Sequence, residues 1–214
     1  MISSKIGHRL DFPLSKLIKL LFRTNNLNPT HFTLLGLLVN LFAAVAFVSG
    51  EWLWAGFFVL TAGFFDMLDG AVARTFGKVT NFGGFLDSVI DRYSDLFLLI
   101  GLIIYYANNQ DMHLLILTAV VSMGTILIPY TRVRAEVFIP HCGVGIMERA
   151  ERIILIAAGG IFQSFFNIMP VVLWVLAIST HLTVLYRIYF TWKEARKLKG
   201  FQLCSVAARI YKPQ

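Results

Sequence analysis

The chain has 214 residues, of which 57% are hydrophobic and only 14% are charged. Soluble domains carry about 25% charged residues, and the apolar residues here come in long runs, so the composition excludes an ordinary soluble domain and indicates one integral membrane domain. The formal net charge of +7 does not indicate a nucleic-acid partner, because the basic residues lie in the gaps between the apolar runs.

The first 30 residues precede the apolar runs and are predicted to form a juxtamembrane segment. Within it, residues 11–23 place leucine and isoleucine on one helical face, with the basic residues off that face. The stretch is too short to cross a bilayer. We therefore expect an interfacial amphipathic helix that lies on the membrane surface.

The apolar runs predict six transmembrane helices within residues 31–197, followed by a basic C-terminal tail at 198–214. These runs cover about 31–49, 52–73, 82–107, 112–136, 147–162 and 168–192. Pro129 is expected to kink the fourth run, because proline cannot donate a helical hydrogen bond. The predicted fold class is an all-α integral membrane protein with six transmembrane helices and an N-terminal surface helix.

The distribution of basic residues predicts the orientation. If the N-terminus lies inside, the outer turns fall at residues 49–52, 107–112 and 162–168, and they contain no lysine or arginine. All 19 basic residues then lie on the inner side or at the inner ends of the runs. The positive-inside rule places both termini in the cytoplasm. We expect a multi-pass protein of the cell (inner) membrane.

Four carboxylates recur at fixed offsets between Asp66 and Asp91. Helical spacing places Asp66 and Asp69 on one face, and Asp87 and Asp91 on another. The short link between the two helices would fold one helix back on the other and bring all four together. Such a group is costly to bury unless a divalent cation binds it, and oxygen ligands favour Mg²⁺ or Mn²⁺. The sequence predicts a metal site that holds one or two ions and faces the cytoplasm.

The same stretch carries residues suited to bind a phosphate. Gly70 and Ala73 have little bulk, which would let a nucleotide approach the helix closely. Arg74 offers a forked, charge-assisted contact to phosphate oxygens. Its alternative role is an ordinary anchor on the positive side of the membrane. Together with two metal ions, these residues indicate phosphoryl transfer.

The pattern D-x-x-D-G-x-x-A-R-x8-G-x3-D-x3-D, from Asp66 to Asp91, resembles the signature of the CDP-alcohol phosphatidyltransferases at every defined position. Enzymes of that family transfer a phosphatidyl group from a CDP-linked lipid, such as CDP-diacylglycerol, to an alcohol and release CMP. The resemblance implies that Asp66, Asp69, Asp87 and Asp91 bind the metal, and that Asp91 is also the general base. It further implies a homodimer.

The resemblance also implies a set of residues that bind the CDP-lipid. Asn28, Pro29 and Thr33 resemble a family segment that usually reads Pro-Asn-x-x-Thr, although Thr30 stands where asparagine is common. The other residues lie in the acidic motif itself: Gly70, Ala73, Arg74 and Gly83.

Five arginines near the inner ends of the last three runs are expected to bind the acceptor: Arg132, Arg134, Arg149, Arg152 and Arg187. Arginines within membrane spans are costly unless they are paired or face a wet cavity, and a converging group would suit an acceptor that carries a phosphate. The pattern R-A-E followed by E-R-x-E-R resembles the phosphatidylinositol-phosphate synthase branch, which uses inositol 1-phosphate. The alternative is pairing between helices, for instance Arg134 with Glu148 or Arg152 with Glu136.

Other functions stay open on the residues alone. The acceptor would be glycerol 3-phosphate in a phosphatidylglycerophosphate synthase, or phosphatidylglycerol in a cardiolipin synthase. A different class is a divalent-metal transporter that uses the same four aspartates, although transport sites usually lie near the bilayer midplane. Asp95 extends the acidic face by one turn but lies outside the motif, and it is either a metal ligand or a group that supports the ligands or the structure.

Overall fold

The structure is a computed structural model that describes residues 28–139 and 141–210, with side chains up to residue 197. In this part of the chain it contains six α-helices and no strand, which confirms the all-α class. The helices are α2 (Pro29–Val48), α3 (Trp52–Thr75), α4 (Asn81–Asn108), α5 (Met112–Glu136), α6 (Arg149–Phe166) and α7 (Met169–Ile210). The surface helix expected at 11–23 lies outside the described residues.

Four of these helices are long and apolar enough to cross a membrane: α2, α3, α5 and the Met169–Lys197 part of α7. The other two carry charged residues along their buried sides. Asp87, Asp91 and Asp95 lie in the first half of α4, and α6 begins with Arg149 and Arg152. Charges at membrane depth require partners inside the bundle, so α4 and α6 carry the polar site.

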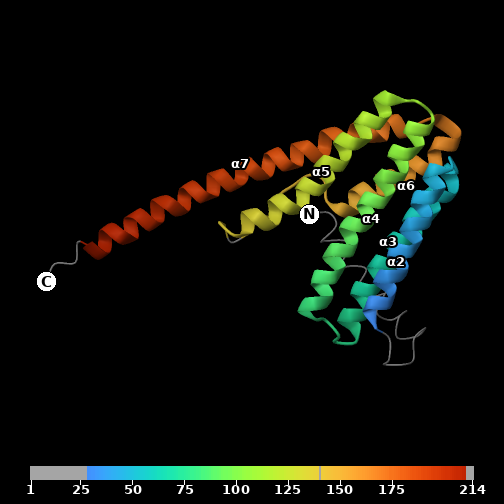
Figure 1. The fold of residues 1–214 in the computed structure, drawn as a ribbon. Helices are drawn as coiled ribbons and strands as arrows, with labels where there is room; N and C mark the ends of the chain where they lie inside the picture. Colours follow the sequence, from blue (N-terminus) through green and yellow to red (C-terminus); the bar gives the residue numbers. More distant parts are fainter. Residues whose placement is uncertain (1–27, 140, 211–214) are drawn as a thin grey trace.

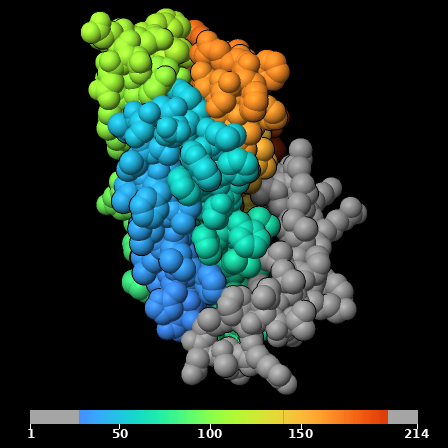
Figure 2. Space-filling view, turned by 90° about the vertical axis from the view of Figure 1, so that its right-hand side faces the viewer, coloured from blue at the N-terminus to red at the C-terminus, as the bar shows by residue number. Residues whose placement is uncertain are grey.

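The helices fall into two groups (Figure 1). Helices α2, α3, α4 and α6 stand together, whereas α5 and α7 pack on each other and run away from that group. The α2–α3, α4–α5 and α6–α7 connections lie at one end of the bundle, and the α3–α4 link lies at the other. Figure 2 shows α2 and α3 side by side on one face. Leu38 and Phe42 of α2 and Trp54 of α3 are exposed. An apolar surface of this kind suits contact with lipid.

The apolar core fills the half of the bundle nearest the three short connections. Phe47, Leu102 and Leu173 are completely buried there. Trp52 packs edge-on against Tyr105, with ring centroids 4.6 Å apart. The core therefore separates the three turns from the acidic residues at the opposite end.

Glycines set the close approach of the helices that carry the site. A Cβ atom on Gly56 of α3 would lie 2.7 Å from the carbonyl oxygen of Ala157 on α6. A Cβ atom on Gly101 of α4 would lie 2.6 Å from the carbonyl oxygen of Ala44 on α2. Both separations are too short for a larger residue, so glycine permits these backbone contacts. They hold α6 against α3 and α4 against α2.

The predicted orientation can be tested by labelling single cysteines in intact cells. Asn109 is exposed in the α4–α5 turn, and Gly143 is exposed in the loop before α6. We expect a membrane-impermeant maleimide to label Asn109→Cys but not Gly143→Cys, in a Cys204→Ser background. Cys142 is buried and is a poor reporter. Labelling of Gly143→Cys in intact cells would contradict the orientation, and its labelling in opened cells is the control.

Candidate active site

The turn between α3 and α4 brings the two halves of the acidic motif together. Gly77 adopts a φ of 63°, a left-handed conformation that favours glycine at the end of a helix. The backbone N–H of Lys78 donates to the carbonyl oxygen of Ala73 at 2.9 Å and closes α3. The hydroxyl of Thr80 accepts from the N–H of Gly83 at 3.0 Å and caps α4. Because the turn is short, α4 returns along α3.

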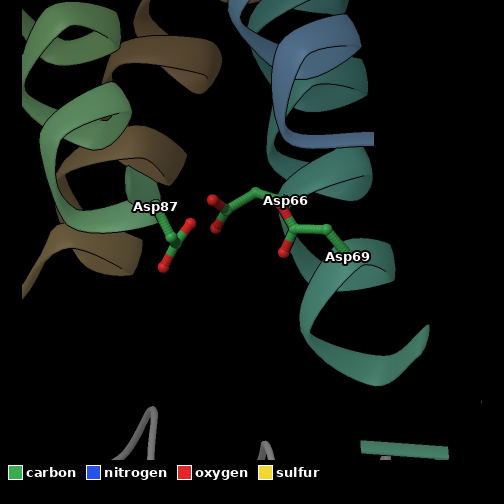
Figure 3. A group of neighbouring side chains, drawn as sticks. All are labelled: Asp66, Asp69 and Asp87. Atoms are coloured by element: carbon green, nitrogen blue, oxygen red, sulfur yellow. The ribbon is translucent and has the colours of Figure 1, made fainter. Parts of the chain in front are cut away.

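Three carboxylates meet beside this turn. Asp66 and Asp69 of α3 and Asp87 of α4 each offer an oxygen, and these oxygens all lie within 4.8 Å of one another. Figure 3 shows Asp66 and Asp87 pointing toward each other, with Asp69 beside Asp66. One oxygen of Asp69 and one of Asp87 are buried with no hydrogen-bond partner among the described residues. Buried oxygens that converge in this way fit Mg²⁺ or Mn²⁺.

Asp91 lies one helical turn beyond Asp87, and its carboxylate contacts arginines instead of the other three aspartates. Its Oδ1 is 3.0 Å from Nη1 of Arg149, and its Oδ2 is 3.7 Å from Nη1 of Arg92. The same Nη1 of Arg149 donates to Asp66 at 2.7 Å. Arg149 therefore links Asp91 to the cluster of three, and the role of Asp91 as a fourth ligand stays a prediction.

The first turn of α6 explains the E-R-x-E-R pattern. Glu148 and Glu151 form a capping box, in which the N–H of Glu148 donates to Oε2 of Glu151 at 3.1 Å. Arg149 and Arg152 are three residues apart and share a face of the helix. Nη2 of Arg152 donates to Asp95 at 2.6 Å. The two glutamates begin the helix, and the two arginines reach the aspartates of α4.

The five arginines expected at the acceptor site make different contacts, although Arg132 and Arg152 lie near enough to Arg187 for their charges to act on it. Their joint contact with an acceptor stays a prediction. Arg132 is exposed and donates to Glu136 at 3.2 Å. The Arg152–Glu136 pair of the alternative interpretation is therefore replaced by Arg152–Asp95 and Arg132–Glu136. The guanidinium of Arg134 lies 5.4 Å from the ring centre of Phe138. Of these five arginines, Arg149 touches the acidic motif at Asp66 and Asp91, and Arg152 touches Asp95 one turn beyond it.

Arg187 is buried and joins three segments. Its Nε donates to the carbonyl oxygen of Val144 at 2.7 Å, and its Nη1 donates to the carbonyl oxygen of Ile128. It therefore ties the loop before α6 and the end of α5 to α7. Arg187 and Arg134 also line a cavity of about 330 Å³ between α5 and α7, to which Trp192 contributes.

The residues expected to bind the CDP-lipid lie around the same end of the bundle. Asn28 and Pro29 begin α2, and Thr33 is buried one turn later with its side chain against Asp69. The guanidinium of Arg74 lies over Gly70, since a Cβ atom there would be 3.2 Å from Nη1 of Arg74. This contact gives Gly70 a local reason to lack a side chain.

Ala73 and Gly83 have local roles as well. Ala73 supplies the carbonyl oxygen that closes α3. A Cβ atom on Gly83 would lie 2.9 Å from the hydroxyl oxygen of Thr80, so the cap of α4 requires the small residue. Their contact with a nucleotide stays a prediction.

Asn40 is a further candidate for the site, which the acidic motif does not include. This residue of α2 is buried, and its Oδ1 has no hydrogen-bond partner among the described residues. It lines a small cavity of about 10 Å³ with Asp91, Ser94 and Arg149. Polar side chains inside a transmembrane run are costly and mark functional positions, so an asparagine within the run 31–49 was the signal to note.

Known proteins similar to this chain point to one enzyme family. Residues 26–191 match the CDP-alcohol phosphatidyltransferase family. The archaetidylinositol phosphate synthase of Pyrococcus horikoshii is 36% identical over 195 residues, which cover 91% of this chain and 96% of that protein. The phosphatidylinositol phosphate synthase of Mycobacteroides abscessus is 34% identical over 166 residues, or 75% of this chain and 76% of that one.

Solved structures similar to this one come from the same kind of enzyme. The phosphatidylinositol phosphate synthase of Mycobacterium tuberculosis with CDP-DAG bound superposes with a TM-score of 0.75 at 30% identity, covering 86% of this chain and 94% of that chain. The same enzyme in complex with manganese and citrate also gives a TM-score of 0.75, covering 85% of this chain and 88% of the other. The match extends over the whole acidic motif and the arginines of α6, and this protein belongs to the CDP-alcohol phosphatidyltransferase family.

Proposed function

We propose that this enzyme transfers a phosphatidyl-type group from a CDP-linked lipid to inositol 1-phosphate and releases CMP. The observation that carries the proposal is the cluster of Asp66, Asp69 and Asp87, which lies next to Asp91 and the arginines of α6. The relatives named as inositol phosphate synthases support the choice of acceptor. The CDP-DAG bound in the Mycobacterium tuberculosis enzyme supports the choice of donor, either CDP-diacylglycerol or a related CDP-lipid.

Asp66, Asp69 and Asp87, with Asp91 beside them, would hold two ions of Mg²⁺ or Mn²⁺. Bound ions would supply charge stabilisation for the donor's pyrophosphate and its leaving group. The buried carboxylate oxygens without partners support this fit, as does the manganese in the Mycobacterium tuberculosis enzyme.

Side chains of the protein would bind the donor and activate the acceptor. Arg74, Gly70, Ala73 and Gly83, with Asn28, Pro29 and Thr33 on α2, would bind the cytidine diphosphate part. Asp91 takes the proton from an acceptor hydroxyl as that oxygen attacks the β-phosphorus of the donor. The bond between the β-phosphorus and the bridging oxygen breaks, and CMP leaves with that oxygen. A carboxylate one turn from the metal cluster is well placed for this proton transfer.

The chain is a multi-pass membrane protein, and we place its active site on the cytoplasmic side of the cell (inner) membrane. The absence of lysine and arginine from the three turns at the opposite end supports this orientation. A homodimer is part of the proposal, because members of the family to which the chain belongs are usually dimeric. Cross-linking of the purified protein in detergent tests the dimer.

The acceptor is tested by CMP release from CDP-diacylglycerol and its diether counterpart with a panel of acceptors. We expect turnover with inositol 1-phosphate, and at least about a hundredfold less with unphosphorylated inositol, since loss of charge-assisted contacts to phosphate costs a few kcal/mol at about 1.4 kcal/mol per decade. Turnover with glycerol 3-phosphate alone would make the protein a phosphatidylglycerophosphate synthase. Turnover with phosphatidylglycerol alone would make it a cardiolipin synthase, and no CMP release with any acceptor would contradict the reaction.

A further inference from the structure

Asp95 lies beside both arginines in the first turn of α6. It lies on α4 one turn beyond Asp91 and is buried. Its Oδ2 accepts from Nη2 of Arg152 at 2.6 Å, and its Oδ1 lies 3.6 Å from Nε of Arg149. One carboxylate thus contacts two guanidinium groups from the first turn of α6. Such a contact orients both groups as well as balancing their charge.

Arg152 keeps one donor group unused in this arrangement. The side chain is 4% exposed, and its Nη1 is buried with no hydrogen-bond partner among the described residues. A buried guanidinium nitrogen without an acceptor is costly. The positive charge and the free donor together suit an anion with several oxygens, and phosphate is one of the anions whose geometry a guanidinium matches.

Arg149 is held differently, because its Nη1 already contacts Asp66 and Asp91. Its Nε lies 3.6 Å from Asp95, too far for a hydrogen bond, and has no hydrogen-bond partner among the described residues. Arg149 is therefore held by Asp66 and Asp91, whereas Arg152 is held by its hydrogen bond to Asp95. The two arginines share a carboxylate but have different tasks.

We propose that Asp95 is a positioning residue, which fixes Arg152 so that its free Nη1 meets the phosphate of the acceptor while Arg149 stays on Asp66 and Asp91. The inference rests on the proposed function, because it assumes an acceptor that bears a phosphate. It assigns no contact between Asp95 and the substrates. Asp95 acts on the acceptor through Arg152.

The test measures how variants of the purified full-length protein bind inositol 1-phosphate, by the ligand-dependent shift in thermal unfolding. Asp95→Asn is expected to raise the Kd of inositol 1-phosphate by about tenfold, which corresponds to about 1.4 kcal/mol. The KM of the CDP-lipid should change less than about twofold in the same variant. Asp111→Asn is the matched control, because Asp111 caps α5 at the other end of the bundle and asparagine also caps helices.

A double-variant cycle separates positioning from general stability. If Asp95 acts through Arg152, then Asp95→Asn combined with Arg152→Gln should bind inositol 1-phosphate no more weakly than Arg152→Gln alone. Losses that simply add, or an Asp95→Asn variant with unchanged Kd, would overturn the inference. If Asp95→Asn is too unstable to purify, Asp95→Glu replaces it, because that change keeps the charge but moves the carboxylate. An unchanged Kd in Asp95→Glu would likewise overturn the inference.

If the proposed function itself is wrong, the wild-type protein shows it by the acceptors that it uses. If the wild-type protein uses another phosphorylated alcohol, the proposed acceptor is wrong, and the same cycle with that alcohol decides the role of Asp95. If the wild-type protein turns over only unphosphorylated acceptors, both the proposed function and the positioning role are contradicted.

Discussion

Asp69→Asn is expected to lower CMP release by about a hundredfold or more at a Mn²⁺ concentration that saturates the wild-type enzyme. The loss exceeds the ten- to hundredfold effect typical of residues that only support metal ligands. Asp69 is buried, and its side chain is one of three whose oxygens lie within 4.8 Å of one another. Asparagine keeps the size of the side chain but removes its charge, so the metal affinity falls while the packing is retained. Mn²⁺ binding by electron paramagnetic resonance, alongside activity as a function of Mn²⁺ concentration, measures both effects.

Removal of the metal should have the same consequence in the wild-type protein. Excess EDTA is expected to abolish CMP release, and added Mg²⁺ or Mn²⁺ should restore it. Asp111→Asn provides the control, since it removes a carboxylate far from the cluster and should retain the wild-type Mn²⁺ affinity. Full activity in excess EDTA, or wild-type Mn²⁺ affinity in Asp69→Asn, would rule out a metal site at these aspartates.

Asp91→Asn is expected to reduce kcat by about a hundredfold to ten-thousandfold, the usual contribution of a general base. The KM of the CDP-lipid should stay nearly unchanged, because Asp91 contacts Arg149 and lies outside the group of three carboxylates. The variant should remain folded, since Asp66 and Asp95 still balance the charge of Arg149. Steady-state kinetics at several Mn²⁺ concentrations measure the two parameters separately.

The Mn²⁺ series decides between the two roles of Asp91. A general base is not replaced by more metal, so the activity of Asp91→Asn should stay low at high Mn²⁺. Recovery of activity at high Mn²⁺ would identify Asp91 as a metal ligand only. Equal losses in kcat and in apparent donor affinity would identify a structural role.

The class of protein and the position of its acidic site follow from local patterns in the sequence. Long apolar runs require helices in a membrane, because backbone polar groups there must bond to one another. Helical periodicity placed Asp66 and Asp69 on one side of a helix, and Gly77 marked the turn that returns the chain. The metal cluster of Asp66, Asp69 and Asp87 follows from these local rules, since the link between its two helices is short.

The partners of the arginines were decided by the tertiary structure alone. Periodicity assigns Arg149 and Arg152 to one face of α6, but it does not say which neighbouring helix that face meets. The close contact of α6 with α3 at Gly56 and the capping box at Glu148 fix this choice. The hydrogen bonds of Arg187 to backbone oxygens of segments distant in the sequence also could not be read from spacing, and its contact with the acceptor stays a prediction.

Asp95 and Asn40 show the same limit. From its spacing, Asp95 could be a metal ligand or a structural or supporting group, because spacing alone does not reveal that two arginines lie beside one carboxylate. Asn40 stands in an apolar run, and only the packing of four helices places it in a cavity beside Asp91. Local structure depends on neighbours a few residues away, which a sequence shows directly. Contacts between helices depend on how whole faces pack, and that packing is settled only when the bundle forms.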